Sequence, residues 1–379
     1  MTEVVVIGAG IVGAACAYYL ARAGARVVVL EASSVAAGTS SAGEGNVLLS
    51  DKPAGPELSL AVWSRQLWDG IGTAVGAEAI ELEPKGGLMV WATPADRPAR
   101  LLAGHRAAGV AVTELAGDAL TEREPRLAPG LAGGAFYPQD AQVQPVLATA
   151  ALLAASGADL RCGVRVEAIE VNAAGNVTGV RVTGGGQVRA DAVVNATGVA
   201  AGELAKTVGT RLPIEPRRGF ILVTEPLHGP DQPPPIKHKV YAADYLDSVA
   251  SDDTGLLTSA VIEGTRAGTV LIGSSRERAG FDLGYPLPVL RAIAARALAL
   301  FPFLARVQLL RTYRGFRPFT PDHLPVIGPD PRTGGLWHAC GHEGAGIGLA
   351  PATGALIAAL VTGADPAVDP APFAPARFA

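Results

Sequence analysis

The clearest pattern of apolar and polar positions lies at the start of the chain, in residues 4–31. An apolar run at 4–7 ends at three glycines with the spacing G-x-G-x-x-G, and a second apolar run at 27–30 ends at Glu31. Short apolar runs bounded by turn residues are typical of buried strands. The pattern therefore predicts a strand, a tight turn, a helix and a second strand.

The three glycines of this segment have separate mechanical roles in a dinucleotide-binding turn. Gly8 permits the sharp turn, Gly10 lets backbone N–H groups approach a diphosphate, and Gly13 lets the helix lie close to the sheet. The diphosphate then lies at the positive end of the helix dipole. Glu31, at the tip of the second strand, can accept hydrogen bonds from a ribose. We therefore expect a dinucleotide site here.

The rest of the chain alternates between helical and extended patterns. Apolar spacing of three to four residues predicts helices at 58–75, 95–109, 143–156, 287–301 and 352–361. Extended apolar patterns predict strands at 86–91, 133–138, 190–195, 216–223, 256–259 and 270–273, and short antiparallel strands within 160–182 joined by a hairpin at 172–176. This mixture predicts an α/β chain whose second region is α+β.

Three further glycine-rich stretches are candidates for contact with a cofactor. Residues 38–46 form a small, hydroxyl-rich loop, which could wrap a phosphate or be an ordinary flexible loop. The buried strand at 190–195 ends in Ala-Thr-Gly, where small residues permit close approach of a cofactor or simply tight packing. Residues 340–351 open a helix, and such a glycine-dense start suits an anion or a dipole acceptor. Two such helix starts suit a cofactor with two polar ends.

Two uncharged stretches, 4–21 and 345–363, also permit a membrane-spanning interpretation. The first has glycines at dinucleotide spacing and no basic leader, which argues against a signal peptide. The second contains Pro351 and four glycines. We therefore expect both to be buried helices or strands and expect no integral membrane segment.

Composition narrows the classes of function. The chain has 379 residues, 49% of them hydrophobic, which is enough to form two domains. Its net charge is −4, so its composition does not indicate binding to nucleic acid. Cys16, Cys162 and Cys340 are far apart and form no C-x-x-C pair. We therefore expect no metal site or iron–sulfur cluster, and a reducing, cytoplasmic location.

Together these motifs resemble the D-amino-acid-oxidase superfamily of FAD oxidoreductases, which includes glycine oxidase, sarcosine oxidase and D-amino-acid dehydrogenases. The resemblance rests on the N-terminal fingerprint, Arg-Gly-Phe at 218–220, Gly-Phe-Arg-Pro at 315–318 and Gly-His-Glu-Gly at 341–344. Residues 41–46 and the glycine-rich helix start look closest to flavin subunits named hydrogen cyanide synthase, opine oxidase or D-hydroxyproline dehydrogenase.

The resemblance implies a glycine oxidase-like fold of class α/β (α+β), with two domains that are both discontinuous in sequence. A Rossmann-like FAD-binding domain would comprise 1–84, 140–215 and 311–379. A mixed-sheet substrate domain would comprise 85–139 and 216–310 and would lie over the flavin ring.

The resemblance also implies FAD in an extended pose, with NAD as the alternative dinucleotide. The residues that this pose assigns to the cofactor are Gly8, Gly10, Ile11, Val12, Gly13, Glu31, Ala32, Ser40, Ser41, Ala42, Gly43, Val166, Ala196, Gly198, Gly344, Ala345, Gly346, Ile347 and Gly348. The cysteine that binds flavin covalently in monomeric sarcosine oxidases falls where this chain has Arg317-Pro318. We therefore expect non-covalent FAD and a structural role for Cys340.

The same resemblance implies that Arg317 binds the substrate carboxylate. From the residues alone, Arg314 and Arg311 are equal candidates. The alternative for each of the three arginines is a structural ion pair. Tyr241 and Tyr245 fall where the substrate domain covers the active site, which makes them lid candidates.

His342 could tune the flavin or take up a proton, or be a packed, hydrogen-bonded residue. A second arginine of glycine oxidase is replaced here at 343–345, which argues against a glycine-type pocket.

These implications converge on oxidation of the C–N bond of an amino or imino acid, such as a D-amino acid, a D-hydroxyproline-like compound or an opine, by hydride transfer from Cα to flavin N5. Electrons would pass to a partner subunit or a quinone, in a hetero-oligomer or a homo-oligomer. The alternatives are a stand-alone oxidase that uses O2 and a non-catalytic flavin subunit of a complex.

Overall fold

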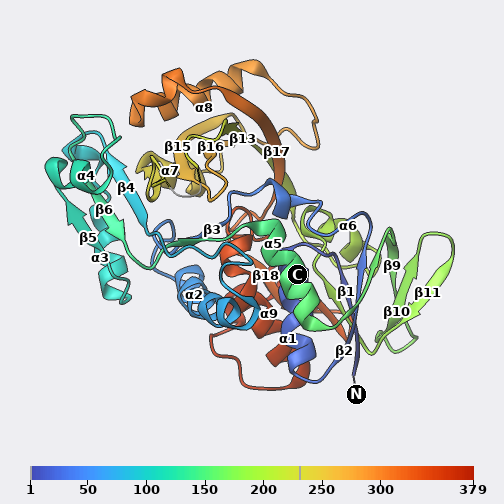
Figure 1. Cartoon of the computed structure of the whole chain (residues 1–379). Coiled ribbons are helices and arrows are strands. Elements are labelled where there is room, and N and C mark those ends of the chain that lie inside the picture. Colours follow the sequence, from blue (N-terminus) through green and yellow to red (C-terminus); the bar gives the residue numbers. More distant parts are fainter. Residues whose placement is uncertain (1, 230–231) are drawn as a thin grey trace.

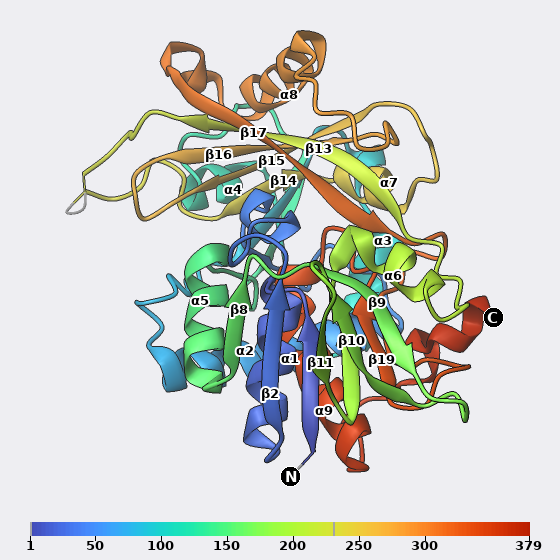
Figure 2. The ribbon, with the colours of Figure 1, turned by 90° about the vertical axis from the view of Figure 1, so that its right-hand side faces the viewer.

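The computed structural model describes residues 2–229 and 232–379, which form two large sheets stacked one above the other (Figures 1 and 2). The lower sheet has six strands, in the order β18 (Val326–Pro329), β19 (Leu336–Cys340), β12 (Ala192–Asn195), β1 (Glu3–Ile7), β2 (Arg26–Glu31) and β8 (Asp159–Cys162). All neighbours run parallel except β18, which is antiparallel to β19.

The two faces of β1 are covered by different elements, as the alternation of side chains along a strand requires. Val4 and Val6 pack in the core that contains α1 (Ile11–Arg22) and α9 (Gly346–Thr362). Val5 and Ile7 face a second core that contains the three-stranded sheet of β9 (Val166–Val171), β10 (Val177–Val182) and β11 (Gly186–Arg189). Burial on both faces explains the uninterrupted apolar run at the start of the chain.

The upper sheet has eight strands and carries its own core. Their order is β17 (Leu309–Phe319), β13 (Glu215–Thr224), β16 (Val270–Arg276), β15 (Leu257–Gly264), β14 (Lys239–Ala242), β4 (Gly87–Trp91), β6 (Gly133–Tyr137) and β5 (Thr113–Leu115). The pairs are antiparallel except β14 with β4. Helix α8 (Leu287–Leu300) covers the outer face of this sheet, farthest from β1 (Figure 2).

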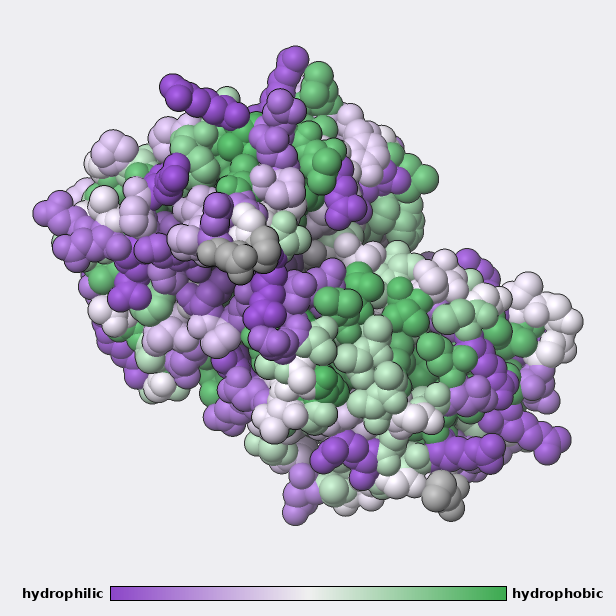
Figure 3. Space-filling view, viewed as in Figure 1, coloured by the Kyte–Doolittle hydropathy of each residue, from purple (hydrophilic) through white to green (hydrophobic). Residues whose placement is uncertain are grey.

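The remaining elements cover the sheets or join them. They are α2 (Pro56–Val75), α3 (Ala99–Ala107), α4 (Gly117–Arg123), α5 (Pro145–Ser156), α6 (Ala201–Lys206), α7 (Asp244–Ala250), β3 (Asn46–Val47) and β7 (Ala141–Gln142). Apolar surface gathers over α5 in the space-filling view (Figure 3), where Val146 and Leu147 are exposed. Among the described residues, no helix combines the length and the apolar character needed to cross a membrane.

The predicted fold class is confirmed, and two local interpretations of the strands change. The antiparallel reading of 160–182 is right for β9 and β10, but β8 joins the lower sheet parallel to β2. Strand β17, the first strand of the segment 311–379, pairs along its length with β13 in the upper sheet. The domain boundaries stay predictions.

Helices α1 and α9 lie unusually close together because a glycine stands at their contact. A Cβ on Gly354 would lie 2.5 Å from the backbone carbonyl of Ala15. The first turn of α9 is also fixed by α2, since Ser64 Oγ donates to Gly348 O at 2.6 Å and Trp68 Nε1 donates to the same oxygen at 3.2 Å. These contacts hold the start of α9 beside the start of α1.

We predict that Gly354→Ala destabilises the fold by about 1–3 kcal/mol, because the new methyl group forces the two helices apart. Gly70 in α2 is the matched control, since a Cβ there meets nothing within 4 Å. Gly70→Ala is expected to leave stability unchanged or raise it by up to about 1 kcal/mol. Chemical unfolding curves measure both variants, and equal effects would contradict the close-contact explanation.

Candidate active site

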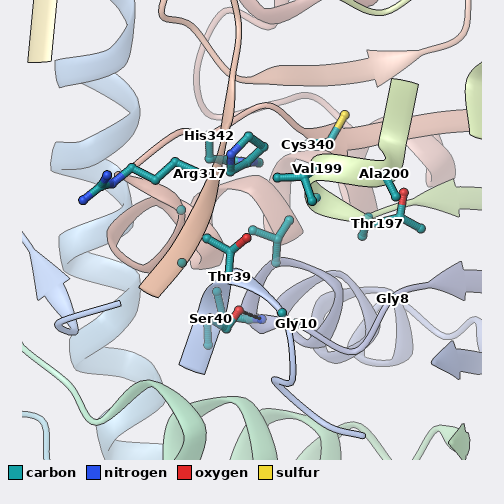
Figure 4. A pocket seen from close by; sticks show the side chains of 18 of the residues that line it. Gly8, Gly10, Thr39, Ser40, Thr197, Val199, Ala200, Arg317, Cys340 and His342 are labelled. Atoms are coloured by element: carbon teal, nitrogen blue, oxygen red, sulfur yellow. Dashed lines mark hydrogen bonds between the residues drawn. The ribbon is translucent and has the colours of Figure 1, made fainter. Parts of the chain in front are cut away.

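A cavity of about 460 Å³ lies between the two sheets and is lined by segments from both ends of the chain. The nucleotide fingerprint after β1, the loop 38–46, the end of β12, strand β17 and the start of α9 all contribute to its wall. Figure 4 shows Thr39 and Ser40 between Gly10 on one side and Arg317 and His342 on the other. The cavity is therefore long enough to connect the dinucleotide motif with the candidate substrate residues.

The glycines of the fingerprint have the mechanical roles that their spacing predicts. Gly8 has a φ of +104°, and a Cβ on it would lie 2.6 Å from Ala196 O. A Cβ on Gly13 would lie 2.0 Å from Gly8 O, so this glycine lets α1 pack on the turn and does not line the cavity. Side chains at either position would close the gap between β1, α1 and β12.

Glu31 is fixed at the mouth of the cavity by the backbone. Its Oε2 accepts a hydrogen bond from Ala9 N at 2.9 Å, and its Oε1 accepts one from Ser33 N at 2.8 Å. Each carboxylate oxygen keeps a further lone pair. The carboxylate is therefore held ready to accept hydrogen bonds from ribose hydroxyl groups.

The first turns of α1 and α9 both open on the cavity. Neither helix has a side-chain cap at its N-cap residue or an acidic residue in its first turn. Ser40 Oγ accepts from Ile11 N at 2.9 Å, and the other first-turn N–H groups have no side-chain acceptor among the described residues. Uncapped helix starts attract anions and acceptor groups. An elongated cofactor with a diphosphate and an electron-rich ring edge fits this wall.

Arg317 on β17 is the cationic group at the other end of the cavity. Its Nη1 donates to Ser275 O at 2.9 Å, and no carboxylate lies within 4.0 Å of its guanidinium among the described residues. Burial, with the neighbouring charge of Arg276, lowers the pKa of Arg317 to about 10, so it stays charged at neutral pH. Arg311 and Arg314 do not line the cavity, and Arg314 stacks over Tyr285 at 4.7 Å.

Two buried arginines, Arg217 and Arg276, share one carboxylate partner, Glu343. Glu343 Oε1 is 2.7 Å from Arg217 Nη1 and 3.8 Å from Arg276 Nε. Burial alone raises the pKa of Glu343, but the hydrogen bond from His323 and the charges of Arg276, Arg217 and Arg317 hold it at about 2. Of Arg217, Arg276 and the half-buried Arg317, only Arg317 lines the cavity, so a substrate anion would bind there.

The two tyrosines predicted as lid residues differ in position. Tyr245 lines the cavity, and its Oη accepts from Arg276 Nη2 at 3.1 Å. Tyr241 is fully buried, does not line the cavity, and packs edge-on against Tyr245 with ring centroids 5.6 Å apart. Its side chain on β14 faces the core, so it supports Tyr245 from behind.

His342 lines the cavity and is a packed, hydrogen-bonded residue. Its Nε2 lies 2.9 Å from Thr353 Oγ1, and burial lowers its pKa to about 3. The imidazole is therefore neutral at physiological pH, and its low pKa makes it a poor proton acceptor.

Most of the predicted cofactor residues line this one cavity. They are Gly8, Gly10, Ile11, Val12, Glu31, Ala32, Ser40, Ala42, Gly43, Val166, Ala196, Gly198, Gly344, Gly346 and Ile347. Gly13, Ser41, Ala345 and Gly348 do not. The carbonyl oxygen of Gly348 accepts a hydrogen bond from Ser64 Oγ on α2. Ser41 is exposed, and its hydroxyl donates a hydrogen bond to Gly38 O.

Several other residues at the site were not predicted from the sequence. Arg217 and Arg276 carry no motif signal as partners of Glu343, because their contacts join segments far apart in the chain. Glu44 lines the cavity within the loop 38–46, where a lone carboxylate among glycines and hydroxyls was the available signal.

Cys340 also lines the cavity, but burial raises the pKa of its thiol to about 12. Such a thiol is almost entirely protonated and a weak nucleophile, which agrees with non-covalent cofactor binding. Within the described ranges, no group of His, Cys, Asp and Glu side chains is arranged to hold a metal ion.

A parallel sheet with a dinucleotide fingerprint, joined through one cavity to a half-buried arginine, is typical of a dinucleotide-binding enzyme. Comparison with known proteins identifies the family. The model of the FAD dependent oxidoreductase family matches residues 3–360, so the chain belongs to this family. The chain is therefore an FAD-dependent flavoenzyme of the amino-acid oxidoreductase class, and FAD rather than NAD is its cofactor.

Individual relatives agree with this assignment. The chain is 31% identical to a glycine oxidase of Pseudomonas putida over 98% of each chain. It is 32% identical to hydrogen cyanide synthase subunit HcnC of Pseudomonas aeruginosa over 68% of this chain and 58% of that one. The crystal structure of glycine oxidase from Geobacillus kaustophilus superposes with a TM-score of 0.86 at 30% identity, covering 99% of this chain and 98% of the other.

We predict that Glu343→Gln destabilises the protein at neutral pH, because it leaves two buried guanidinium groups without their carboxylate partner. The pKa of Glu343 is depressed from 4.5 to about 2, so its stabilisation is complete above pH 4.5 and disappears as the pH falls towards 2. That shift corresponds to about 3 kcal/mol at neutral pH. Unfolding free energies of both proteins between pH 7 and 3 should therefore converge, and a constant gap would exclude this source of stability.

Proposed function

We propose that the protein oxidises the C–N bond of an amino or imino acid whose carboxylate binds Arg317. The observation that carries this proposal is the half-buried guanidinium of Arg317, which faces the cavity without a carboxylate partner among the described residues. A planar guanidinium binds a carboxylate through two parallel hydrogen bonds and so fixes its orientation. Glu343 forms ion pairs with Arg217 and Arg276, the charged neighbours of Arg317, and not with Arg317 itself.

FAD, when bound, would supply the acceptor for the hydride, a proton with two electrons, that leaves the substrate Cα. The residues of the chain bind the substrate, orient it and exclude water from it. Arg317 fixes the carboxylate, and Tyr245 covers the site from α7 while its hydroxyl is held by Arg276. The uncapped start of α9 provides backbone donors that stabilise negative charge on an acceptor. Because His342 is neutral with a low pKa, the reaction does not depend on it as a base.

The substrate class that we propose is a D-amino acid, a D-hydroxyproline-like compound or an opine. A second arginine is absent from the helix start at 343–345, and Glu343 there is paired with Arg217. This supports a pocket that differs from that of the relatives named glycine oxidase. The site residues proposed for this reaction are Arg317 and Tyr245, with Tyr241 and His342 in supporting positions.

For the electron acceptor we propose a partner subunit or a quinone, in a cytoplasmic complex. The relative named hydrogen cyanide synthase subunit HcnC supports assembly with other subunits. Oxygen is the second candidate, which the full-length similarity to proteins named glycine oxidase favours.

Arg317→Ala is expected to lower kcat/KM for the amino acid by about 10²–10³-fold, because a desolvated, charge-assisted contact with the carboxylate is lost. Arg317→Lys should recover only part of this loss, since a lysine cannot make the two parallel bonds. Arg314→Ala, on the same strand but outside the cavity, is the control and should stay within about threefold of the wild type. Unchanged turnover in Arg317→Ala with full FAD content would reject the assignment and favour a non-catalytic flavin subunit.

The electron acceptor can be identified by reducing the FAD-loaded protein anaerobically with its amino acid and then mixing it with oxygen or a quinone. We expect slow reoxidation by oxygen and faster reoxidation by the quinone. Reoxidation by oxygen on the millisecond scale would instead establish the oxidase alternative.

A further inference from the structure

Glu44 is a buried residue in the cavity wall, and one of its two carboxylate oxygens has no hydrogen-bond partner among the described residues. It lies between the 3₁₀ turn Thr39–Ala42 and β3, and only 8% of the residue is exposed. Its Oε2 lies 2.7 Å from Lys239 Nζ and accepts from Asn46 Nδ2 at 3.1 Å. Its Oε1 has no hydrogen-bond partner among the described residues. A buried carboxylate oxygen without a donor is costly, which indicates that a donor arrives with a ligand.

The charge of Glu44 is only partly neutralised within the protein. Lys239 Nζ also lies 3.3 Å from Glu263 Oε2, so one ammonium group serves two buried carboxylates. The neighbouring Lys85 does not fill the gap, since its Nζ donates to Gly264 O at 2.6 Å and lies beside Glu83. Glu263 does not line the cavity. Of the two carboxylates beside Lys239, only Glu44 lines the cavity, so its carboxylate is the one that a cationic donor in the cavity would meet.

Strand β16 relates Glu44 to the carboxylate anchor. Arg317 Nη1 donates to Ser275 O, and a Cβ on Gly273 would lie 2.3 Å from Glu44 Oε1. Gly273 and Ser275 are two residues apart on β16. The charge of Glu44 also raises the pKa of Arg317, although three other neighbours act more strongly. The guanidinium of Arg317 and Glu44 Oε1 thus approach the same short stretch of β16.

An α-amino acid has the shape and charges to bridge these two groups. Its nitrogen is bonded to the carbon next to the carboxylate, and a hydrogen bond of about 2.9 Å at each end completes the span. A 2-hydroxy acid or a simple carboxylic acid would leave Glu44 Oε1 without a cationic donor. Two fixed ends also leave one defined direction for the Cα–H bond.

We propose that Glu44 Oε1 forms the subsite for the α-amino group of the substrate, opposite Arg317, and selects α-amino or imino acids over other carboxylates. This inference rests on the proposed function, since it takes Arg317 as the carboxylate anchor. It gives Gly273 a specific role, because any larger residue there would displace the carboxylate of Glu44.

The test compares two ligands that differ in the amino group. 2-Aminoisobutyrate cannot be oxidised because its Cα carries no hydrogen, and isobutyrate has a similar shape without the nitrogen. Calorimetric titration of the FAD-loaded protein gives both dissociation constants. Glu44→Gln is expected to raise the dissociation constant of 2-aminoisobutyrate by about tenfold or more and to leave that of isobutyrate within about twofold of the wild-type value.

Glu263→Gln is the matched control, because it removes the other carboxylate from Lys239 without touching the cavity wall. It should leave the preference between the two ligands unchanged. Gly273→Ala is a second variant that keeps the charge of Glu44 but shifts it, and it should weaken 2-aminoisobutyrate selectively. FAD content and thermal unfolding verify that each variant is folded.

The outcomes separate the two proposals. If Glu44→Gln and Gly273→Ala change both affinities equally, or neither, the amino-group subsite is wrong while the carboxylate anchor stands. If the wild type binds neither ligand, or Arg317→Ala leaves isobutyrate affinity unchanged, the proposed function itself fails.

Discussion

The close packing of α1 against α9 is the constraint on which the site depends. The two helices begin more than 300 residues apart in the chain, yet their uncapped N-termini open on one cavity. Gly354 permits this approach, since a side chain there would overlap the backbone of Ala15. Helix starts can attract an anion or an acceptor group only over about one turn, so their separation decides whether a single cofactor reaches both. Packing of small residues thus determines what the cavity binds.

Burial of charge is the second organising feature. Inside a protein an unpaired charge is costly, and a paired one is strong because water is excluded. The chain pairs Glu343 with Arg217 and Arg276, and Lys239 with Glu44 and Glu263. Within the described residues, this leaves the guanidinium of Arg317 without a carboxylate partner and Glu44 Oε1 without a hydrogen-bond partner at the cavity wall. The guanidinium is complementary to the carboxylate of an amino-acid zwitterion, and the carboxylate oxygen is complementary to its ammonium group. The charges buried by the fold are therefore linked to the proposed class of substrate.

The sequence predicted what is encoded by short-range spacing. The fingerprint from Gly8 to Glu31 and the start of α9 could be recognised because a tight turn and a helix start need glycine at fixed intervals. Contacts between segments far apart in the chain could not be recognised from the sequence. The contact of Glu343 with Arg217 spans 126 residues, and nothing in either neighbourhood indicates the other. Tyr241 and Tyr245 looked equivalent in sequence, but one faces the core from a strand and the other reaches the cavity from a helix.

The most direct test of this account is a crystal structure of the FAD-loaded protein with 2-aminoisobutyrate. The account predicts a single FAD in contact with the first turns of both α1 and α9, and a ligand whose carboxylate is bonded to Arg317. A cofactor that touches only one of the two helix starts, or a ligand bound away from Arg317, would contradict it.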